Sequence, residues 1–445
     1  MKRNGTVWLD LTDLQEWSGH FTGVQRVVFE YATRLVSDKS LNVRFLRFNQ
    51  YHKDIKEIRY EDVFSNENDT HPTQVEGVHM DVKDRIKQQL IRVSGSLPPF
   101  LQEQLTQDRK KKLKQVAKKV YRGAQKAKHG AAVLKHRLVR NVQPSSYKAV
   151  TLTDQDTVLI VGKLWDYPEY VDLLSVLKQK VGFRYIQLIH DIIPVYQRHL
   201  FGDGLFEPFS NFLFEAVSGA DELICISDST AADVRFFAKD IGIQKELAIK
   251  RIQLGDTPQI TAEATKPDFV SDKEKFLLTV GTVEVRKNHQ LLYSVYKLAR
   301  ERGVTLPKLV VVGGNGWLTE NMRFMVEHDD ETKDTIVFKS GVSDTALKWL
   351  YQNCLFTVYP SIYEGWGLPV RESFAYGKYC ITTKRSSLPE AGGTMAGYAS
   401  GYDANEFLEK ITETLNNLAA ITKKTQKYQP YTWDQSYETL RSIIS

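Results

Sequence analysis

The sequence EGWGLPVRE occupies residues 364–372 and sets two carboxylates eight positions apart, across a glycine turn and the start of a helix. Pro369 suits the first helical position, where the backbone N–H that proline lacks would have no partner. Gly377 can end the same helix, because glycine readily adopts the left-handed conformation found after helices. The pattern therefore predicts a short helix over residues 369–376 that carries the second carboxylate.

The glycines of this stretch precede the positive end of the predicted helix dipole. The N–H groups of Gly365 and Gly367 would face a ligand there, and phosphate or sugar oxygens are favoured at such a position. Glu364 and Glu372 can each accept hydrogen bonds from the hydroxyl groups of a sugar. The pattern indicates a nucleotide-sugar site. The alternative is an ordinary helix start with acidic residues that suit the dipole.

A second motif begins with an apolar run at residues 275–280, which predicts a buried strand followed by a glycine. Asn288 is expected to cap the helix that comes next. Arg286 and Lys287 lie just before that cap, and two cations at the positive end of a helix dipole repel it unless an anion lies between them. The motif therefore predicts a bound phosphate or pyrophosphate. The alternative is a solvated basic turn.

The C-terminal half resembles a known family in several motifs, with matching order and spacing. These motifs are GTVEVRKN at residues 281–288, Gly313-Gly314, SIY at 361–363, EGWGLPVRE at 364–372, LPE at 388–390, Gly392-Gly393 and YTWD at 431–434. Together they resemble the family 4 retaining glycosyltransferases, which have the GT-B fold. The resemblance covers most of residues 270–445. It implies an α/β protein of two Rossmann-like domains that face each other across a cleft.

The resemblance also implies a role for each matching residue. In this family the residue matching Glu372 binds the nucleotide ribose, the one matching Glu364 contacts the donor sugar, and the one matching Lys287 holds the diphosphate. Thr282 stands where some members carry a second phosphate-binding arginine, and Arg286 is expected to compensate. The expected donor-binding residues are Glu372, Gly365, Trp366, Gly367, Leu368, Gly281, Thr282, Gly313 and Val342. The expected catalytic residues are Lys287, Arg286, Glu364 and His190.

The N-terminal half agrees with the same fold. Residues 7–11 predict a strand, residues 18–23 predict a loop, and a helical stripe of apolar residues follows. Such a unit can bring its loop to a ligand in the cleft, although any α/β protein contains similar units. The expected acceptor and phosphate loop residues are Gly19, Thr22 and Gly23. His190 ends another apolar run, where a lone histidine is ordinarily structural; the resemblance implies that it faces the diphosphate and the reacting sugar carbon.

Length and composition support two domains. A chain of 445 residues exceeds what one core usually holds, and 42% hydrophobic residues can fill two cores. Continuous apolar runs separated by helical stripes are typical of parallel sheets covered on both faces. The expected divisions are residues 1–258, residues 270–428 and, by resemblance, a C-terminal segment at 429–445 that crosses back to the first domain.

The net charge of +6 arises in one segment. Fourteen Lys and Arg lie between residues 109 and 148, within an expected basic helical insertion at about residues 80–148, and the rest of the chain is net acidic. Apolar residues at helical spacing would let residues 109–140 lie on an anionic membrane surface, which suits a lipid-linked acceptor. A solvated helical insertion packed on the first domain is the alternative. Nucleic acid is not an expected partner, because no binding module accompanies the charge.

Cysteine usage bears on the compartment. Cys225, Cys354 and Cys380 lie in apolar runs and indicate a reducing environment. The N-terminus has acidic residues where a signal peptide needs an apolar core, and no run approaches the roughly 18 apolar residues of a transmembrane helix. We expect a cytoplasmic protein, peripheral on the inner face of the plasma membrane if residues 109–140 bind lipid.

Asp154 and Asp156 match the short D-x-D pattern of metal-dependent glycosyltransferases, but they precede the apolar run at residues 157–161 and indicate a turn. No other set of ligands supports a metal site. We therefore expect no cofactor and no metal.

These observations predict a retaining glycosyltransferase. It would move a hexose from a nucleoside diphosphate to a hydroxyl of a glycan or lipid-linked acceptor in surface polysaccharide biosynthesis. Stabilisation of the departing diphosphate would supply most of the catalysis. The alternatives are a nucleotide-sugar epimerase of the same fold and a catalytically silent, membrane-associated scaffold. The donor base, the sugar and the acceptor stay open.

Overall fold

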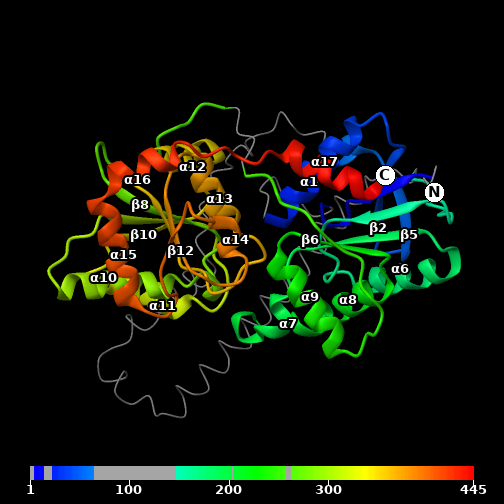
Figure 1. Ribbon diagram of the computed structural model, residues 1–445, viewed down its shortest axis with the longest axis horizontal. Helices are drawn as coiled ribbons and strands as arrows, with labels where there is room; N and C mark the ends of the chain where they lie inside the picture. Colours follow the sequence, from blue (N-terminus) through cyan, green and yellow to red (C-terminus); the bar gives the residue numbers. More distant parts are fainter. Residues whose placement is uncertain (1–4, 15–22, 65–146, 203, 257–261) are drawn as a thin grey trace, which may run out of the picture. The chain divides into compact units, whose positions relative to one another are not determined.

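The computed structural model describes residues 5–14, 23–64, 147–202, 204–256 and 262–445 (Figure 1). Gly19, Thr22 and the basic segment at residues 109–140 lie outside the described residues, so the expectations for them stay predictions. In the described part of the chain, no helix combines the length and the apolar character needed to cross a membrane.

Seven strands of the described chain form the first sheet, in the order β3-β2-β1-β4-β5-β6-β7. Their bounds are β1 Val7–Asp10, β2 Val43–Asn49, β3 Asp54–Ile58, β4 Thr157–Ile160, β5 Arg184–Ile189, β6 Glu222–Cys225 and β7 Ile249–Arg251. Neighbouring strands are parallel except β2 and β3, which are antiparallel. Parallel pairing brings the carboxyl ends of β1, β4 and β5 to one edge of the sheet.

Six described strands form the second sheet, in the order β10-β9-β8-β11-β12-β13. Their bounds are β8 Phe276–Val280, β9 Lys308–Val312, β10 Ile336–Lys339, β11 Thr357–Tyr359, β12 Cys380–Thr382 and β13 Gly397–Tyr398. Every neighbouring pair is parallel. The two doubly wound sheets predicted from the sequence are therefore present.

Helices follow most strands. Those of the first sheet are α1 Gly23–Ser37, α2 Tyr60–Phe64, α6 Pro168–Val181, α7 Ile193–Tyr196, α8 Phe206–Gly219 and α9 Asp228–Asp240. Those of the second sheet are α10 His289–Glu301, α11 Glu320–His328, α12 Asp344–Asn353, α13 Leu368–Ala375, α14 Leu388–Gly392, α15 Ala404–Asn416 and α16 Leu418–Thr425. The chain ends in α17 Trp433–Ile444, and the short 3-10 turns are η1 Thr12–Leu14, η2 Arg198–Leu200 and η3 Val285–Lys287.

Alternate side chains of the second sheet fill two separate cores. On β8, Leu277 packs into the cluster under α10, α11 and α15, whereas Phe276 and Leu278 pack with α12. Leu309 and Val310 on β9 divide in the same way. Side chains of a strand point alternately to opposite faces, so a continuous apolar run means that both faces are covered.

The last helix of the chain packs on the first. Tyr31 of α1 meets the ring of Trp433 of α17 edge on, with ring centroids 5.9 Å apart. The Tyr31 hydroxyl also hydrogen-bonds Ser436 Oγ at 2.8 Å. The two helices lie on the opposite side of the first sheet from α8 and α9 (Figure 1). Residues 433–444 thus return to the first sheet.

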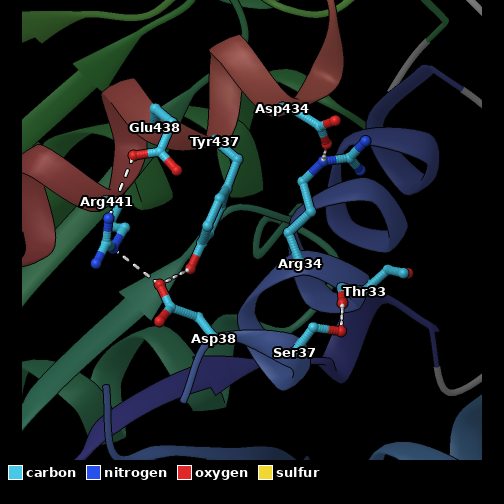
Figure 2. A pocket seen from close by; sticks show the side chains of 8 residues that line it. All are labelled: Thr33, Arg34, Ser37, Asp38, Asp434, Tyr437, Glu438 and Arg441. Carbon is cyan, nitrogen blue, oxygen red and sulfur yellow. Dashed lines mark hydrogen bonds and ion pairs between the residues drawn. The ribbon is translucent and has the colours of Figure 1, made fainter. Parts of the chain in front are cut away.

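A shallow polar groove follows this helix pair (Figure 2). Arg34 Nε donates to Asp434 at 2.8 Å. Asp38 accepts a hydrogen bond from the Tyr437 hydroxyl at 2.7 Å and pairs with Arg441 Nε at 2.9 Å. The charged side chains of the groove are therefore paired within the chain and join the two helices.

Each sheet has a point at which its strand order reverses. β2 and β4 lie on opposite sides of β1, and β9 and β11 lie on opposite sides of β8. Ligands of open α/β sheets bind beyond the carboxyl ends of the strands at such switch points. We call residues 11–14 and 161–163 the first switch point, and residues 281–288 and 360–364 the second.

Candidate active site

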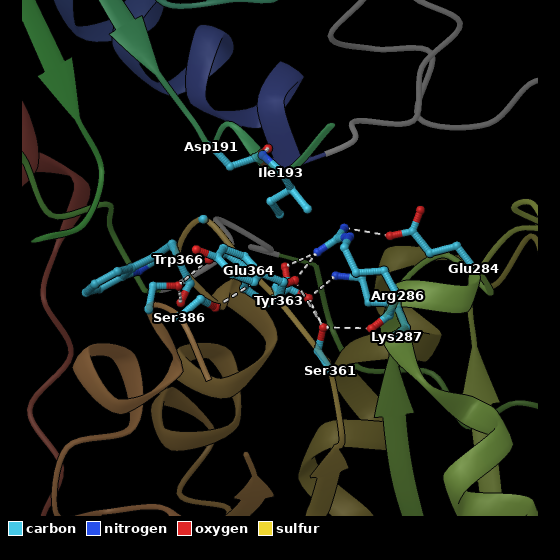
Figure 3. A network of polar contacts seen from close by, with 12 residues as sticks. Asp191, Ile193, Glu284, Arg286, Lys287, Ser361, Tyr363, Glu364, Trp366 and Ser386 are labelled. Atoms are coloured by element: carbon cyan, nitrogen blue, oxygen red, sulfur yellow. Dashed lines mark hydrogen bonds and ion pairs between the residues drawn. The ribbon is translucent and has the colours of Figure 1, made fainter. Parts of the chain in front are cut away.

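Glu364 lies at the centre of a hydrogen-bonded network at the second switch point (Figure 3). Its Oε1 accepts hydrogen bonds from Lys287 Nζ at 2.7 Å, Ser361 Oγ at 2.5 Å and the Tyr359 hydroxyl at 2.9 Å. Its Oε2 lies 2.6 Å from Nη1 of Arg286. The loop after β8 supplies the two cations, and β11 with its following loop supplies the carboxylate and both hydroxyl groups. We call these five residues, with Glu284, the Glu364 network.

Pairing outweighs burial in this network. Burial alone would raise the pKa of the Glu364 carboxyl, but Arg286 and Lys287 lower that pKa to about 2. Burial also opposes the charge of Arg286, yet Glu364 and Glu284 raise its pKa above the ordinary value. Burial and the neighbouring guanidinium both lower the pKa of Lys287. Glu364 and Arg286 are therefore firmly ionised, and Lys287 is the cation whose charge is least favoured.

The carboxylates offer a second explanation for the position of Arg286 and Lys287. Their position before the helix predicted a phosphate that separates them from the helix dipole, and that contact stays a prediction. Glu284 accepts a hydrogen bond from Arg286 Nη2 at 2.6 Å, and Glu364 pairs with both cations. Two cations and two carboxylates balance one another, so the charge of this group does not itself require a bound anion.

Asn288 does not cap α10 in the predicted way. Its backbone has a φ of 59°, a left-handed conformation, and its side chain makes no capping hydrogen bond. Its Nδ2 instead donates to the carbonyls of Pro360 at 3.2 Å and Gly401 at 2.8 Å. Asparagine tolerates this backbone conformation better than most residues. Asn288 therefore ties the loop after β8 to the loop after β11.

Glu372 is a buried residue of α13, and both of its oxygens have partners. Oε1 accepts a hydrogen bond from Arg26 of α1, and Oε2 accepts one from the Tyr351 hydroxyl at 2.9 Å. The helix begins one residue earlier than predicted, so Pro369 occupies its second position. The sequence analysis did not identify Arg26 as a site residue. The feature that could have indicated it is a cation in the first turn of the helix that follows the predicted loop at residues 18–23.

Gly365 lies against the backbone of the first sheet. A Cβ at Gly365 would be 2.1 Å from the carbonyl oxygen of His190, a distance that no side chain can occupy. The Thr230 hydroxyl lies 3.3 Å from the Gly365 carbonyl and 3.4 Å from that of His190. The Cβ side of Gly365 is therefore packed against the protein's own backbone, and its contact with a donor stays a prediction.

His190 follows β5 and turns its ring toward the end of β4. Its Nε2 donates to the carbonyl of Val161 at 2.8 Å, which fixes the proton on that nitrogen. Burial lowers the pKa of His190 to about 4 in spite of this hydrogen bond. The imidazole is therefore neutral near pH 7, and its contact with a diphosphate stays a prediction. Asp191, whose pKa is raised by burial, accepts the N–H of Ile193 at 3.0 Å.

The remaining residues of the turn before α13 have defined positions. Trp366 is 3% exposed, and the guanidinium carbons of Arg251 and Arg371 lie 5.8 and 5.9 Å from its ring centre. A Cβ at Gly23 would be 3.8 Å from Cδ1 of Leu368. Gly367 adopts a φ of 113°, a region that favours glycine. Their predicted contacts with a donor or acceptor stay predictions.

The other predicted donor residues lie at the ends of three neighbouring strands. Gly281 and Gly313 follow β8 and β9 and are in contact, since a Cβ at Gly313 would be 1.9 Å from the Gly281 carbonyl oxygen. Thr282 is exposed beside them. Val342 follows β10 and packs partly against the apolar cluster at α12. The first three therefore lie together near the Glu364 network, and Val342 belongs to the next strand end.

The D-x-D residues lie at the opposite edge of the first sheet from its switch point. Asp156 directly precedes β4 and accepts hydrogen bonds from the N–H groups of Thr6 and Thr153, at 2.9 and 2.8 Å, and from the Thr153 hydroxyl at 2.9 Å. These contacts define a turn. Within the described ranges, no group of three or more His, Cys, Asp or Glu side chains is arranged to hold a metal ion.

A buried ion pair anchors α13 to the segment between the sheets. Arg371 donates through Nε and Nη2 to the two oxygens of Asp256, both at 2.8 Å. Asp256 also accepts the N–H of Tyr431 at 2.7 Å and a hydrogen bond from the Tyr428 hydroxyl. Sequence reasoning gave Arg371 no role, because its partner is 115 positions away. The pair holds the helix that carries Glu372 to the chain segments that leave and re-enter the first sheet.

Two solved structures share the whole architecture. Sucrose-phosphate synthase from Thermosynechococcus elongatus aligns over 99% of this chain and 98% of its own, with a TM-score of 0.58 and 16% identity. HepE from Anabaena, solved with UDP and glucose, aligns over 99% of both chains with a TM-score of 0.54 and 10% identity. Such low identities establish the fold alone. The fold is that of the GT-B glycosyltransferases, as predicted.

Sequence comparison shows which proteins the chain is similar to. Residues 262–431 match the family described as glycosyl transferases group 1. The chain is 25% identical over 252 residues to the serotype-specific mannosyltransferase WbdA of Escherichia coli, a match that covers 55% of this chain and 31% of WbdA. It is 24% identical over 258 residues to the O-antigen chain mannosyltransferase RfbU of Salmonella typhimurium, covering 58% of this chain and 67% of RfbU. The family match is confined to residues 262–431, and the chain spans less than a third of the length of WbdA.

Proposed function

We propose that the protein is a retaining glycosyltransferase that moves a hexose from a nucleoside-diphosphate sugar to a hydroxyl of a glycan or lipid-linked acceptor in surface polysaccharide biosynthesis. The observation that carries the proposal is the Glu364 network, which lies inside the region that matches the group 1 glycosyl transferases. Two relatives are named as mannosyltransferases, and RfbU is named as a mannosyltransferase of the O-antigen chain, so mannose is the first hexose to test.

The Glu364 network suits a departing diphosphate. Lys287 and Arg286 are buried cations on loops at strand ends, so they are preorganised for negative charge that develops as the bond to the sugar breaks. Because Glu364 already pairs with both, an arriving diphosphate replaces part of its contacts with the cations. The freed carboxylate oxygens of Glu364 can then accept a hydroxyl of the donor sugar.

In this proposal, Glu372 accepts hydrogen bonds from the ribose of the nucleotide. A carboxylate has about four acceptor positions, so the contacts with Arg26 and Tyr351 leave room for ribose hydroxyl groups. The acceptor oxygen bonds to the anomeric carbon on the face from which the diphosphate leaves. The departing phosphate oxygen takes the acceptor's hydroxyl proton, so configuration is retained and no protein base is needed.

We also propose that transfer needs no metal, because two cations of this chain already stand at the expected diphosphate position. The test uses the purified full-length protein with GDP-, UDP-, dTDP- and ADP-linked hexoses, with and without a glycan acceptor, followed by chromatography. Transfer that requires acceptor and survives EDTA supports the proposal. A new donor sugar formed without acceptor identifies an epimerase, and an unchanged donor in every mixture identifies a scaffold.

Thermal stabilisation by the four free nucleoside diphosphates identifies the base independently of turnover, because a ligand that binds the folded state raises its stability. Membrane association through residues 109–140 is a separate proposal that rests on their charge. Cosedimentation with anionic vesicles at low salt supports it. Failure to sediment leaves the glycan acceptor as the one to pursue.

A further inference from the structure

The first switch point contains the carboxylate of Asp13, which has no role in the proposed donor binding or sugar transfer. Asp13 lies in η1, directly after β1, beside the residues that follow β4. β1 and β4 are the strands between which the order of the first sheet reverses, which is where sheets of this kind bind ligands. Asp13 therefore holds the position in the first sheet that the Glu364 network holds in the second.

Asp13 is buried and lacks hydrogen bonds within the part of the chain that the structure describes. The residue is 4% exposed, and neither carboxylate oxygen has a hydrogen-bond partner among those residues. Lys163 Nζ lies 3.7 Å from Oδ1, and that ammonium donates to Asp166 at 2.6 Å instead. Leaving a buried carboxylate without partners costs free energy, so its retention calls for an explanation.

A neighbouring aspartate shows that the fold can satisfy a buried carboxylate at this edge. Asp10 accepts hydrogen bonds from the N–H of Thr12 at 3.0 Å, from the Thr12 hydroxyl at 2.9 Å and from the Tyr170 hydroxyl at 2.5 Å. Asp10 is therefore structural, and Asp13, three positions later, is not explained in that way.

The backbone beside Asp13 leaves room for its side chain. A Cβ at Gly162 would be 2.9 Å from the Asp13 Cβ and 3.4 Å from Oδ2. Glycine at this position admits the carboxylate, whereas a side chain there would collide with it. The same edge of the sheet is linked to the proposed donor site. The Val161 carbonyl accepts a hydrogen bond from the His190 ring, and the His190 carbonyl lies against Gly365.

We propose that Asp13 binds the acceptor, by accepting a hydrogen bond from a sugar hydroxyl and so orienting the acceptor at the first switch point. The assignment rests on the proposed function, which supplies an acceptor rich in hydroxyl groups. A hydroxyl donor satisfies an ionised carboxylate without any change in its charge. The ammonium group of Lys163, which now donates to Asp166, lies close enough to Asp13 to become its hydrogen-bond donor.

The test compares wild type with Asp13→Asn in the full-length protein, with GDP-mannose as donor and methyl α-mannopyranoside as acceptor. The asparagine keeps the shape and removes the charge, so kcat/KM for the acceptor should fall about ten- to a hundredfold, as for a lost hydrogen bond to a charged group. KM for the donor and the slow hydrolysis of donor by water should stay within twofold of wild type. Glu169→Gln is the matched control, because it removes an exposed charge of α6 that pairs with Lys53 and not with Lys163, and it should leave all three quantities nearly unchanged.

The outcomes separate the two proposals. An Asp13→Asn variant with the acceptor kinetics of wild type refutes the role of Asp13 and leaves the proposed function intact. Equal losses toward donor and acceptor also refute it, because they indicate a general structural defect. A wild type that transfers no sugar from GDP-, UDP-, dTDP- or ADP-linked hexoses refutes the proposed function and the role of Asp13 with it.

Discussion

At the second switch point, Glu364 meets two cations and two hydroxyl groups, whereas at the first switch point Asp13 has no hydrogen-bond partner in the described ranges. Both carboxylates are buried, at 7% and 4% exposure, and both lie beyond the carboxyl ends of parallel strands. Their pKa values nevertheless move in opposite directions, to about 2 for Glu364 and about 6 for Asp13. Partners, more than burial, decide the charge of a buried acid.

The difference separates two kinds of site. A paired carboxylate is held in place and contributes to stability, so its network exists before any ligand arrives. A buried carboxylate without hydrogen bonds, such as Asp13 with Lys163 at 3.7 Å, has unused acceptor positions at a cost in stability, and it gains partners when a ligand supplies hydroxyl groups.

The largest expected effect is the loss of Lys287. Lys287→Ala should lower kcat by about a hundredfold or more, roughly 3 kcal/mol, because this buried cation lies where the diphosphate charge develops. Initial rates at saturating donor measure the effect, and melting temperature reports the fold. Lys297→Ala is the matched control. Lys297 lies in the second half of α10 and pairs with Asp329 and Glu331. Near-normal turnover of Lys287→Ala would remove the Glu364 network from the mechanism.

The next expected effect distinguishes the roles of Glu372 and Glu364 in nucleotide binding. Glu372→Ala should weaken binding of the free nucleoside diphosphate about tenfold or more, because it loses the proposed ribose contact and leaves Arg26 unpaired. Glu364→Gln should change nucleotide affinity by less than about threefold while it lowers transfer, since its proposed ligand is the sugar. Calorimetry with nucleotide alone measures both. Equal losses of affinity in the two variants would contradict this division.

Sequence reasoning found the second switch point because its features are local. A buried strand, a glycine, two cations and a helix start follow one another within residues 275–288, and the carboxylates share residues 364–372. The same reasoning did not foresee that Glu364 neutralises Arg286 and Lys287, because Glu364 is 77 positions from Lys287 in the chain.

Contacts between distant segments could not be predicted in this way. The pairing of Arg26 with Glu372 spans 346 positions, so the place of Arg26 near the start of a helix does not identify its partner. The contact between Gly365 and His190 follows from the packing of loops that belong to different sheets. Asp13 resembles any acid after a strand, because the absence of a partner is a property of the three-dimensional surroundings.

The smallest expected effect is the most direct test of the contrast, because the two variants should change stability with opposite signs. Glu364 has a pKa below its ordinary value of 4.5, so its stabilisation is present above that value and is lost as pH falls toward 2. Asp13 has a pKa raised from 3.8, so its ionisation destabilises the fold above about pH 6, and this penalty disappears as pH falls toward 4. At pH 8, Glu364→Gln should therefore lower the melting temperature, and Asp13→Asn should raise it.

The penalty at Asp13 corresponds to about 3 kcal/mol at pH 8, because each pH unit between folded and unfolded pKa is worth about 1.4 kcal/mol. A few degrees of melting temperature should result. Lys163 opposes this penalty and Asp166 adds to it. The charge of Asp13 also helps to raise the pKa of the neighbouring Asp10, which burial brings to about 6, so Asp13→Asn relieves Asp10 as well and acts in the same direction. Melting curves at pH 8 and pH 4.5 measure the effect, and the gain of Asp13→Asn should shrink by more than half at the lower pH. A melting temperature lowered by Asp13→Asn at pH 8 would mean that Asp13 has a stabilising partner after all, and the contrast between the switch points would fail.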